Sequence, residues 1–197
     1  MKHKKFDYSK HSLFIFISVL LICGFILGLF LSKYIDINDT FSINNYLSVL
    51  INDADAKEYF ISQFMIGTFS IFTVVLFGTS LFGIPLISFL IYTKGAQIGF
   101  SCALFIISYS FKGILGILIV FIPQTLIDLL SFYMITHFCL LFSLNLVHCS
   151  ISTSMIPIKT RINKLLNILI LCFLLIILSS YLKSTLGIQL IKIFEKL

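Results

Sequence analysis

Long runs of apolar residues fill most of the sequence, and short polar or basic segments separate them. The first run, residues 12–31, holds 20 uncharged residues, which gives about 30 Å of α-helix. Further apolar runs occupy residues 61–93, 95–111, 113–138 and 165–182. Because the hydrocarbon core of a bilayer is about 30 Å thick, this pattern predicts an all-α, polytopic membrane helical bundle with about five transmembrane helices.

The second run is too long for one straight span. Its 33 residues would give about 50 Å of helix, and Gly78, Gly83 and Pro85 interrupt it. We expect one long transmembrane helix, kinked at Gly83–Pro85; a span followed by a re-entrant half-helix is the alternative. Lys94, and then Lys112 with Gly113, divide the apolar residues that follow into two shorter spans.

The ends of the first span indicate how the chain is oriented. A signal peptide would have a shorter apolar core and a cleavage site of small residues, whereas residues 12–31 are followed by Ser32 and Lys33. We therefore expect an uncleaved span. Its N-terminus should be cytoplasmic, since residues 1–11 before the span carry four lysines. Lys94 and the basic residues of 155–164 then lie in cytoplasmic loops, and the acidic segment 32–60 forms a polar external loop.

Composition excludes a soluble domain and a nucleic-acid-binding protein. Apolar residues make up 59% of the 197 residues, charged residues 11%, and the mean hydropathy is +1.09. The net charge of +6 comes from basic residues at the ends of apolar runs, where loops and lipid headgroups favour them, so no nucleic-acid partner is expected. Residues 1–197 are predicted to form a single integral membrane domain whose surroundings are the lipid bilayer.

Motifs of catalysis and cofactor binding do not occur in the sequence. It has neither a nucleotide-binding loop nor an H-E-x-x-H pair, and no Ser-His-carboxylate set stands out. His137 with Cys139, and His148 with Cys149, are the closest nitrogen and sulfur donors, but their spacing is not one that zinc sites use. We predict a protein that is not an enzyme and needs no cofactor or metal.

One polar stripe interrupts the fourth apolar run. Gln124, Thr125, Asp128 and Ser131 share a helix face, and Asp128 is the only carboxylate between Glu58 and Glu195. A carboxylate inside a membrane suggests a proton relay, a transport site or an interhelical contact. The simplest interpretation is that Asp128 stays protonated, or meets Lys94 or Lys112, and holds helices together.

Small residues form a second pattern. Gly95 and Gly99 make a G-x-x-x-G motif, and Gly24 and Gly28 repeat the spacing in the first span. Such glycines allow helix backbones to approach closely, either within one chain or between two copies. We expect packing within the chain.

Several motifs occur in a fixed order across residues 77–143. In order, they are Phe77-Gly78, Gly83-Ile84-Pro85, Lys94-Gly95, Gly99-Phe100-Ser101, Lys112-Gly113, Pro123-Gln124 and Phe142-Ser143. In this order and spacing the sequence resembles the stage II sporulation protein M family, whose length, basic N-terminus and five spans also agree. Two positions depart from the family pattern: Thr125 stands where the family often has Asn, and Asp128 where we expect an apolar residue.

The resemblance implies a role in endospore formation. It implies a non-enzymatic membrane scaffold that assembles with two peptidoglycan-degrading partners, the stage II sporulation proteins D and P. That complex acts at the septal membrane of the mother cell during engulfment of the forespore. The alternative is a permease subunit of an ATP-driven transporter, in which a helix broken at Gly83–Pro85 and the buried Asp128 would line a substrate path.

Overall fold

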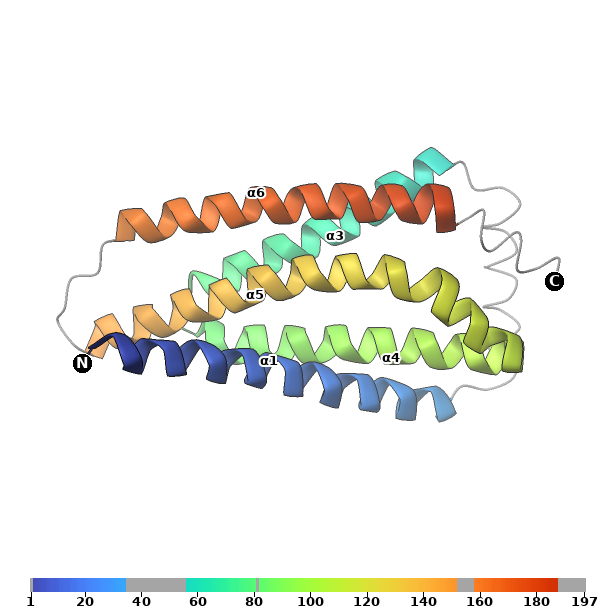
Figure 1. Cartoon of the computed structure of the whole chain (residues 1–197), viewed down its shortest axis with the longest axis horizontal. Helices are drawn as coiled ribbons and strands as arrows, with labels where there is room; N and C mark the ends of the chain where they lie inside the picture. The colour runs from blue at the N-terminus through green and yellow to red at the C-terminus, as the bar shows by residue number, and fades with distance from the viewer. Residues whose placement is uncertain (1, 35–55, 81, 152–157, 188–197) are drawn as a thin grey trace.

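Five long helices form the bundle, which we describe from a computed structural model covering residues 2–34, 56–80, 82–151 and 158–187 (Figure 1). The helices are α1 (Lys2–Leu31), α3 (Ala56–Gly78), α4 (Gly83–Gly116), α5 (Ile122–Ile151) and α6 (Ile158–Leu182). A 3-10 turn, η1 (Ser32–Tyr34), extends α1, and two π-helical turns, η2 (Ile117–Phe121) and η3 (Lys183–Gly187), follow α4 and α6. The described residues contain no β-strand.

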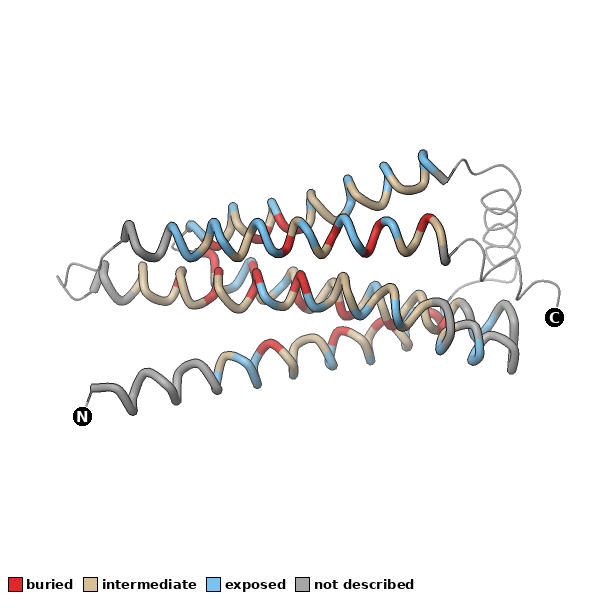
Figure 2. The backbone as a smooth tube through the Cα atoms, turned by 45° about the horizontal axis from the view of Figure 1, so that its top comes forward, coloured by how far each residue is buried: buried red, intermediate tan, exposed pale blue. Residues whose placement is uncertain are grey.

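The long helices run lengthwise beside one another. Helices α1, α4 and α6 run in one direction, and α3 and α5 return in the other (Figure 1). Four segments are long and apolar enough to cross a membrane, namely Ser12–Tyr34, Lys57–Gly78, Ile122–Val147 and Asn163–Thr185. Exposed positions recur along these helices (Figure 2). They include large apolar residues such as Phe69 on α3 and Leu174 on α6. The predicted all-α polytopic membrane bundle is confirmed.

The core lies where α3, α4, α5 and α6 meet. Its fully buried side chains are aliphatic or small, such as Val74, Ile87 and Leu140, and Ile17 of α1 joins them. Serines and a threonine are buried among them, and a hydroxyl can return its hydrogen bond to the carbonyl three or four residues earlier. Ser131, for example, is 2% exposed and donates to the Asp128 carbonyl over 2.8 Å. Polar residues therefore enter this core without disturbing the helices.

The predicted kink at Gly83–Pro85 is wrong, because the chain reverses direction just before it. Helix α3 ends at Gly78, and a short turn leads into α4 at Gly83 (Figure 1). The Ser80 amide donates to the Phe77 carbonyl and the Gly83 amide to the Ser80 carbonyl, over 3.0 and 3.1 Å. Pro85 is the third residue of α4, where its missing N–H leaves no hydrogen bond unmade. The predicted 61–93 span is therefore two helices, and no half-helix forms at this point.

The boundaries predicted at Lys94 and at Lys112–Gly113 are also wrong. Helix α4 passes through both without interruption and is 34 residues long, about 50 Å. One lysine or glycine does not end a helix whose other residues are apolar and whose backbone bonds have no water to replace them. The break comes at η2 and α5, since Pro123 cannot donate a hydrogen bond to the preceding turn. The predicted spans 95–111 and 113–138 thus become the second half of α4 and the helix α5.

The remaining boundaries differ by a few residues. Helix α3 begins at Ala56, so the predicted polar loop 32–60 loses its last residues to a helix and its first to η1. Most of that loop, 35–55, lies outside the described residues. Helix α6 begins seven residues before the predicted 165–182 span, because Ile158 and the basic residues after it continue the helix.

Candidate functional site

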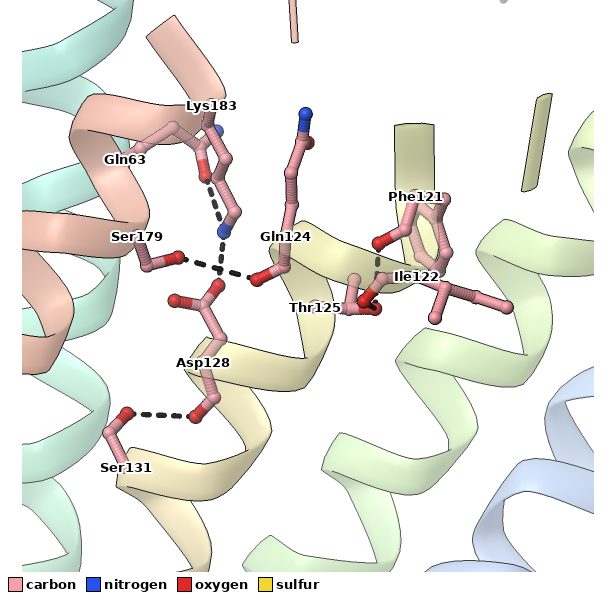
Figure 3. Close-up of polar contacts among 9 residues, drawn as sticks. All are labelled: Gln63, Phe121, Ile122, Gln124, Thr125, Asp128, Ser131, Ser179 and Lys183. Atoms are coloured by element: carbon pink, nitrogen blue, oxygen red, sulfur yellow. Dashed lines mark hydrogen bonds and ion pairs between the residues drawn. The ribbon is translucent and has the colours of Figure 1, made fainter. Parts of the chain in front are cut away.

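Asp128 forms an ion pair with Lys183. Asp128 lies on α5, and Lys183 is the first residue of η3, directly after α6. The Lys183 Nζ also donates to Oε1 of Gln63 on α3 over 3.4 Å (Figure 3). The Lys183 and Asp128 side chains are 16% and 24% exposed, so protein atoms shield most of this contact. Gln63, Asp128 and Lys183, which we call the polar cluster, therefore connect three helices.

The rest of the predicted polar stripe makes local or backbone contacts. The Ser131 hydroxyl donates to the Asp128 carbonyl over 2.8 Å, and Ser179 of α6 reaches the Gln124 carbonyl over 3.4 Å (Figure 3). Thr125 returns its hydroxyl to the Phe121 carbonyl over 2.8 Å. The Gln124 Nε2 atom is buried without a hydrogen-bond partner. Of the four stripe residues, Asp128 thus makes the side-chain contact with another helix.

Lys94 lies inside the bundle and faces the polar cluster. Its Nζ is 5.8 Å from the centroid of the Phe132 ring on α5, which is a cation–π distance. The next residue, Gly95, packs against the Leu21 carbonyl, near the middle of the apolar segment of α1. The prediction that Lys94 belongs to a cytoplasmic loop is therefore wrong: the residue lies within the continuous helix α4, level with the apolar segment of α1.

A pocket of about 100 Å³ lies between Lys94 and the polar cluster. We call it the polar pocket. Helices α3, α4, α5 and α6 and the turn η3 all contribute to it. Its polar lining residues are Gln63, Ser70, Lys94, Asp128, Ser131 and Lys183. Apolar side chains, including Phe132 and Ile176, complete the wall. Two ammonium groups and one carboxylate thus share a small space inside an otherwise apolar bundle.

Four glycines allow α1 and α4 to touch backbone to backbone: Gly24, Gly28, Gly95 and Gly99. A Cβ atom on Gly28 would lie 2.1 Å from the Ala96 carbonyl oxygen, and one on Gly99 would lie 2.1 Å from that of Phe25. Atoms do not approach so closely, so any larger residue would push the helices apart. The two G-x-x-x-G motifs therefore face each other across one interface within the chain.

The model of the family described as stage II sporulation protein M matches residues 16–185. The chain belongs to this family. No curated protein and no solved structure matches the chain. Membership of the stage II sporulation protein M family, together with the apolar helices, makes the chain an integral membrane protein of a sporulation family.

The motif residues of the stage II sporulation protein M resemblance do not gather at one site. Phe77 and Gly78 end α3, and a Cβ on Gly78 would lie 2.6 Å from the Cβ of buried Cys139 on α5. Gly83 begins α4 close to the Phe77 carbonyl, and Pro85 is exposed in the first turn. These residues shape the reversal between α3 and α4.

The other motif residues lie along α4 and at the start of α5. Phe100 places its backbone amide against Gly28, and Ser101 donates to the Gln97 carbonyl of its own helix. Lys112 and Gly113 lie within α4. Pro123 and Gln124 are the second and third residues of α5. Among the motif residues whose side chains the structure describes, Lys94 is the one that lines the polar pocket.

Sequence reasoning missed Lys183 and misplaced Lys94. Lys183 follows directly after the last apolar run, which is where a loop residue would stand. The sequence does contain a signal for both lysines. Asp128 is the only carboxylate between Glu58 and Glu195, so any lysine buried in these helices has a single acidic residue to pair with.

Of the two histidine–cysteine pairs, the structure describes the side chains of His137 and Cys139. No group of three or more His, Cys, Asp or Glu side chains comes together among the residues that the structure describes. Cys139 is buried against Gly78, and the side chains of His148 and Cys149 lie outside the described part.

Proposed function

We propose that this protein is a non-enzymatic membrane scaffold that anchors peptidoglycan hydrolases at the septal membrane of the mother cell during engulfment. The partners that we expect are the stage II sporulation proteins D and P. The observation that carries the proposal is the family match over residues 16–185.

The outer faces of the bundle suit a scaffold. Large apolar side chains point outward on α1, α3 and α6, among them Phe30, Phe72 and Leu174, which are 58%, 62% and 61% exposed. Such faces contact lipid or the transmembrane helices of other proteins. The glycine contact between α1 and α4 makes part of the bundle tightly packed, which supports holding partners in a fixed arrangement.

The experiment that tests this function is affinity purification of the tagged full-length chain from sporulating cells in a mild detergent. We expect both hydrolases to be enriched relative to an unrelated polytopic membrane protein with the same tag. A fluorescent fusion should gather at the septum and follow the engulfing membrane. Absence of both hydrolases, with the chain intact and abundant, would contradict the proposal.

The polar pocket favours a second candidate, the permease subunit of an ATP-driven transporter. Charged groups inside a membrane protein often line a substrate path, and Lys94, Asp128 and Lys183 lie together in this one. The helix reversal before Gly83 gives this candidate no half-helix at that point. The same purification separates the two candidates, because a permease should bring down an ATPase instead of the hydrolases.

A further inference from the structure

The charges of the polar pocket do not balance. Lys183 is paired with Asp128, and its remaining hydrogen bond goes to the neutral Gln63. Lys94 faces the same pocket, and its described contact is with the Phe132 ring. The sequence has no other carboxylate between Glu58 and Glu195. Two ammonium groups therefore share one carboxylate.

An excess positive charge at this depth is costly. Lys94 lies beside Gly95, which touches Leu21 near the middle of the α1 span, so lipid and apolar helices surround its level. A charge in such surroundings is usually paired or placed in a wet cavity. The Phe132 ring compensates part of the charge, but a cation–π contact does not neutralise it.

The pocket has the size and the donors for a small anion. Its volume of about 100 Å³ is several times the roughly 10–15 Å³ that a cavity needs to hold one water molecule, so a ligand of a few atoms fits. Gln63 accepts a hydrogen bond with Oε1, so its amide NH₂ group can donate to a ligand. Ser70 adds a hydroxyl to the wall. These groups suit an oxygen-bearing anion of few atoms.

We infer that the polar pocket is a binding site for a small anionic group of carboxylate or phosphate chemistry, held between the ammonium groups of Lys94 and Lys183. One negative charge makes the pocket neutral, because it adds to the carboxylate of Asp128. The group comes either from a free anion or from the phosphate of a lipid headgroup. This site is separate from the proposed scaffold function, and its test needs neither hydrolases nor sporulating cells.

The test measures the thermal unfolding midpoint of the purified full-length chain in micelles of a maltoside detergent, which carries no phosphate. Sodium acetate or sodium phosphate is titrated at constant pH, and sodium chloride, whose anion has neither carboxylate nor phosphate chemistry, keeps the ionic strength constant. We expect the midpoint to rise and saturate. Lys94→Met should raise the apparent dissociation constant on the order of tenfold or more, because it removes a charge-assisted hydrogen bond. Lys164→Met, which changes an exposed lysine of α6, is the matched control and should leave it unchanged.

A second variant keeps the test decisive if Lys94→Met fails to fold. Asp128→Asn has nearly the same shape but removes the competing negative charge, so it should tighten anion binding, whereas a purely structural role of the lysines predicts no such gain.

Nanodiscs with phosphatidylglycerol identify the source of the anion. A Lys94-dependent rise there without added acetate or phosphate assigns the anion to a headgroup, and a rise with the free salts alone assigns it to solution. Absence of any saturable response, or an equal response in Lys94→Met, would overturn the inference.

Discussion

Asp128 and Lys183 form an ion pair that the sequence did not predict. They lie 55 residues apart, and the sequence suggested Lys94 or Lys112 as the partner. That Asp128 is exceptional follows from its place as a lone carboxylate in an apolar run. Which lysine it meets depends on how α5 and α6 align, and periodicity along one helix does not contain that information.

The ion pair predicts a compensating pair of substitutions. Asp128→Leu and Lys183→Met should each lower the free energy of unfolding by about 1–3 kcal/mol, because each leaves one charge unpaired in a mostly shielded site. The double variant should recover most of that loss, since neither charge remains. Equilibrium unfolding in mixed micelles measures all three. If the losses of the single variants simply add in the double variant, the pair does not stabilise the bundle.

At the scale of helices, proline and glycine indicated where the helices are interrupted, but not that the chain begins a new helix there. Pro85 and Pro123 each lie in the first turn of a helix, where a proline fits without loss of a hydrogen bond. The sequence placed both inside spans, because apolar residues continue on either side of them. Hydropathy does not distinguish a kink from a reversal, since a tight turn at a membrane edge can be as apolar as the helices that it joins.

The close contact between α1 and α4 predicts that adding one methyl group at a glycine of this interface forces the two helices apart. Gly99→Ala should lower the free energy of unfolding by about 1–3 kcal/mol, because the added Cβ meets the backbone of Phe25, which cannot move without the whole helix. Gly67→Ala is the comparison, because its Cβ would meet a side-chain atom, Cγ2 of Ile176, at 2.8 Å and not a backbone atom, so we expect a smaller loss. Both variants gain the same helix propensity. Equal stability of the two in thermal unfolding would show that the α1–α4 contact is not tight.

At the scale of the molecule, the arrangement of the helices places both basic segments at one end. The N-terminus of α1, the reversal between α3 and α4, and the start of α6 lie at the same end of the bundle (Figure 1). With Lys94 inside the bundle, the N-terminal lysines and the basic residues at the start of α6 remain to define the cytoplasmic side. By the positive-inside rule, both segments predict a cytoplasmic N-terminus.

This orientation predicts that two exposed positions are accessible from opposite sides. In a variant without the five native cysteines, Tyr34→Cys should react with an impermeant thiol reagent in intact cells, because the end of α1 faces outward. Thr79→Cys, in the turn between α3 and α4, should react only after permeabilisation. The opposite result for both positions would invert the topology, and labelling of both in intact cells would contradict the arrangement of α1 and α3.

The sequence by itself determined the class of the protein, its family and the residues that are unusual in a membrane. These properties follow from local composition and from the order of short motifs, which do not depend on contacts between distant residues. The tertiary structure decided where the chain reverses, that the two glycine motifs face each other, and that Lys94, Asp128 and Lys183 surround one pocket. The physical reason is that apolar helices in a membrane are all compatible with lipid. Their neighbours are chosen by close packing and by a few polar contacts between residues far apart in the chain.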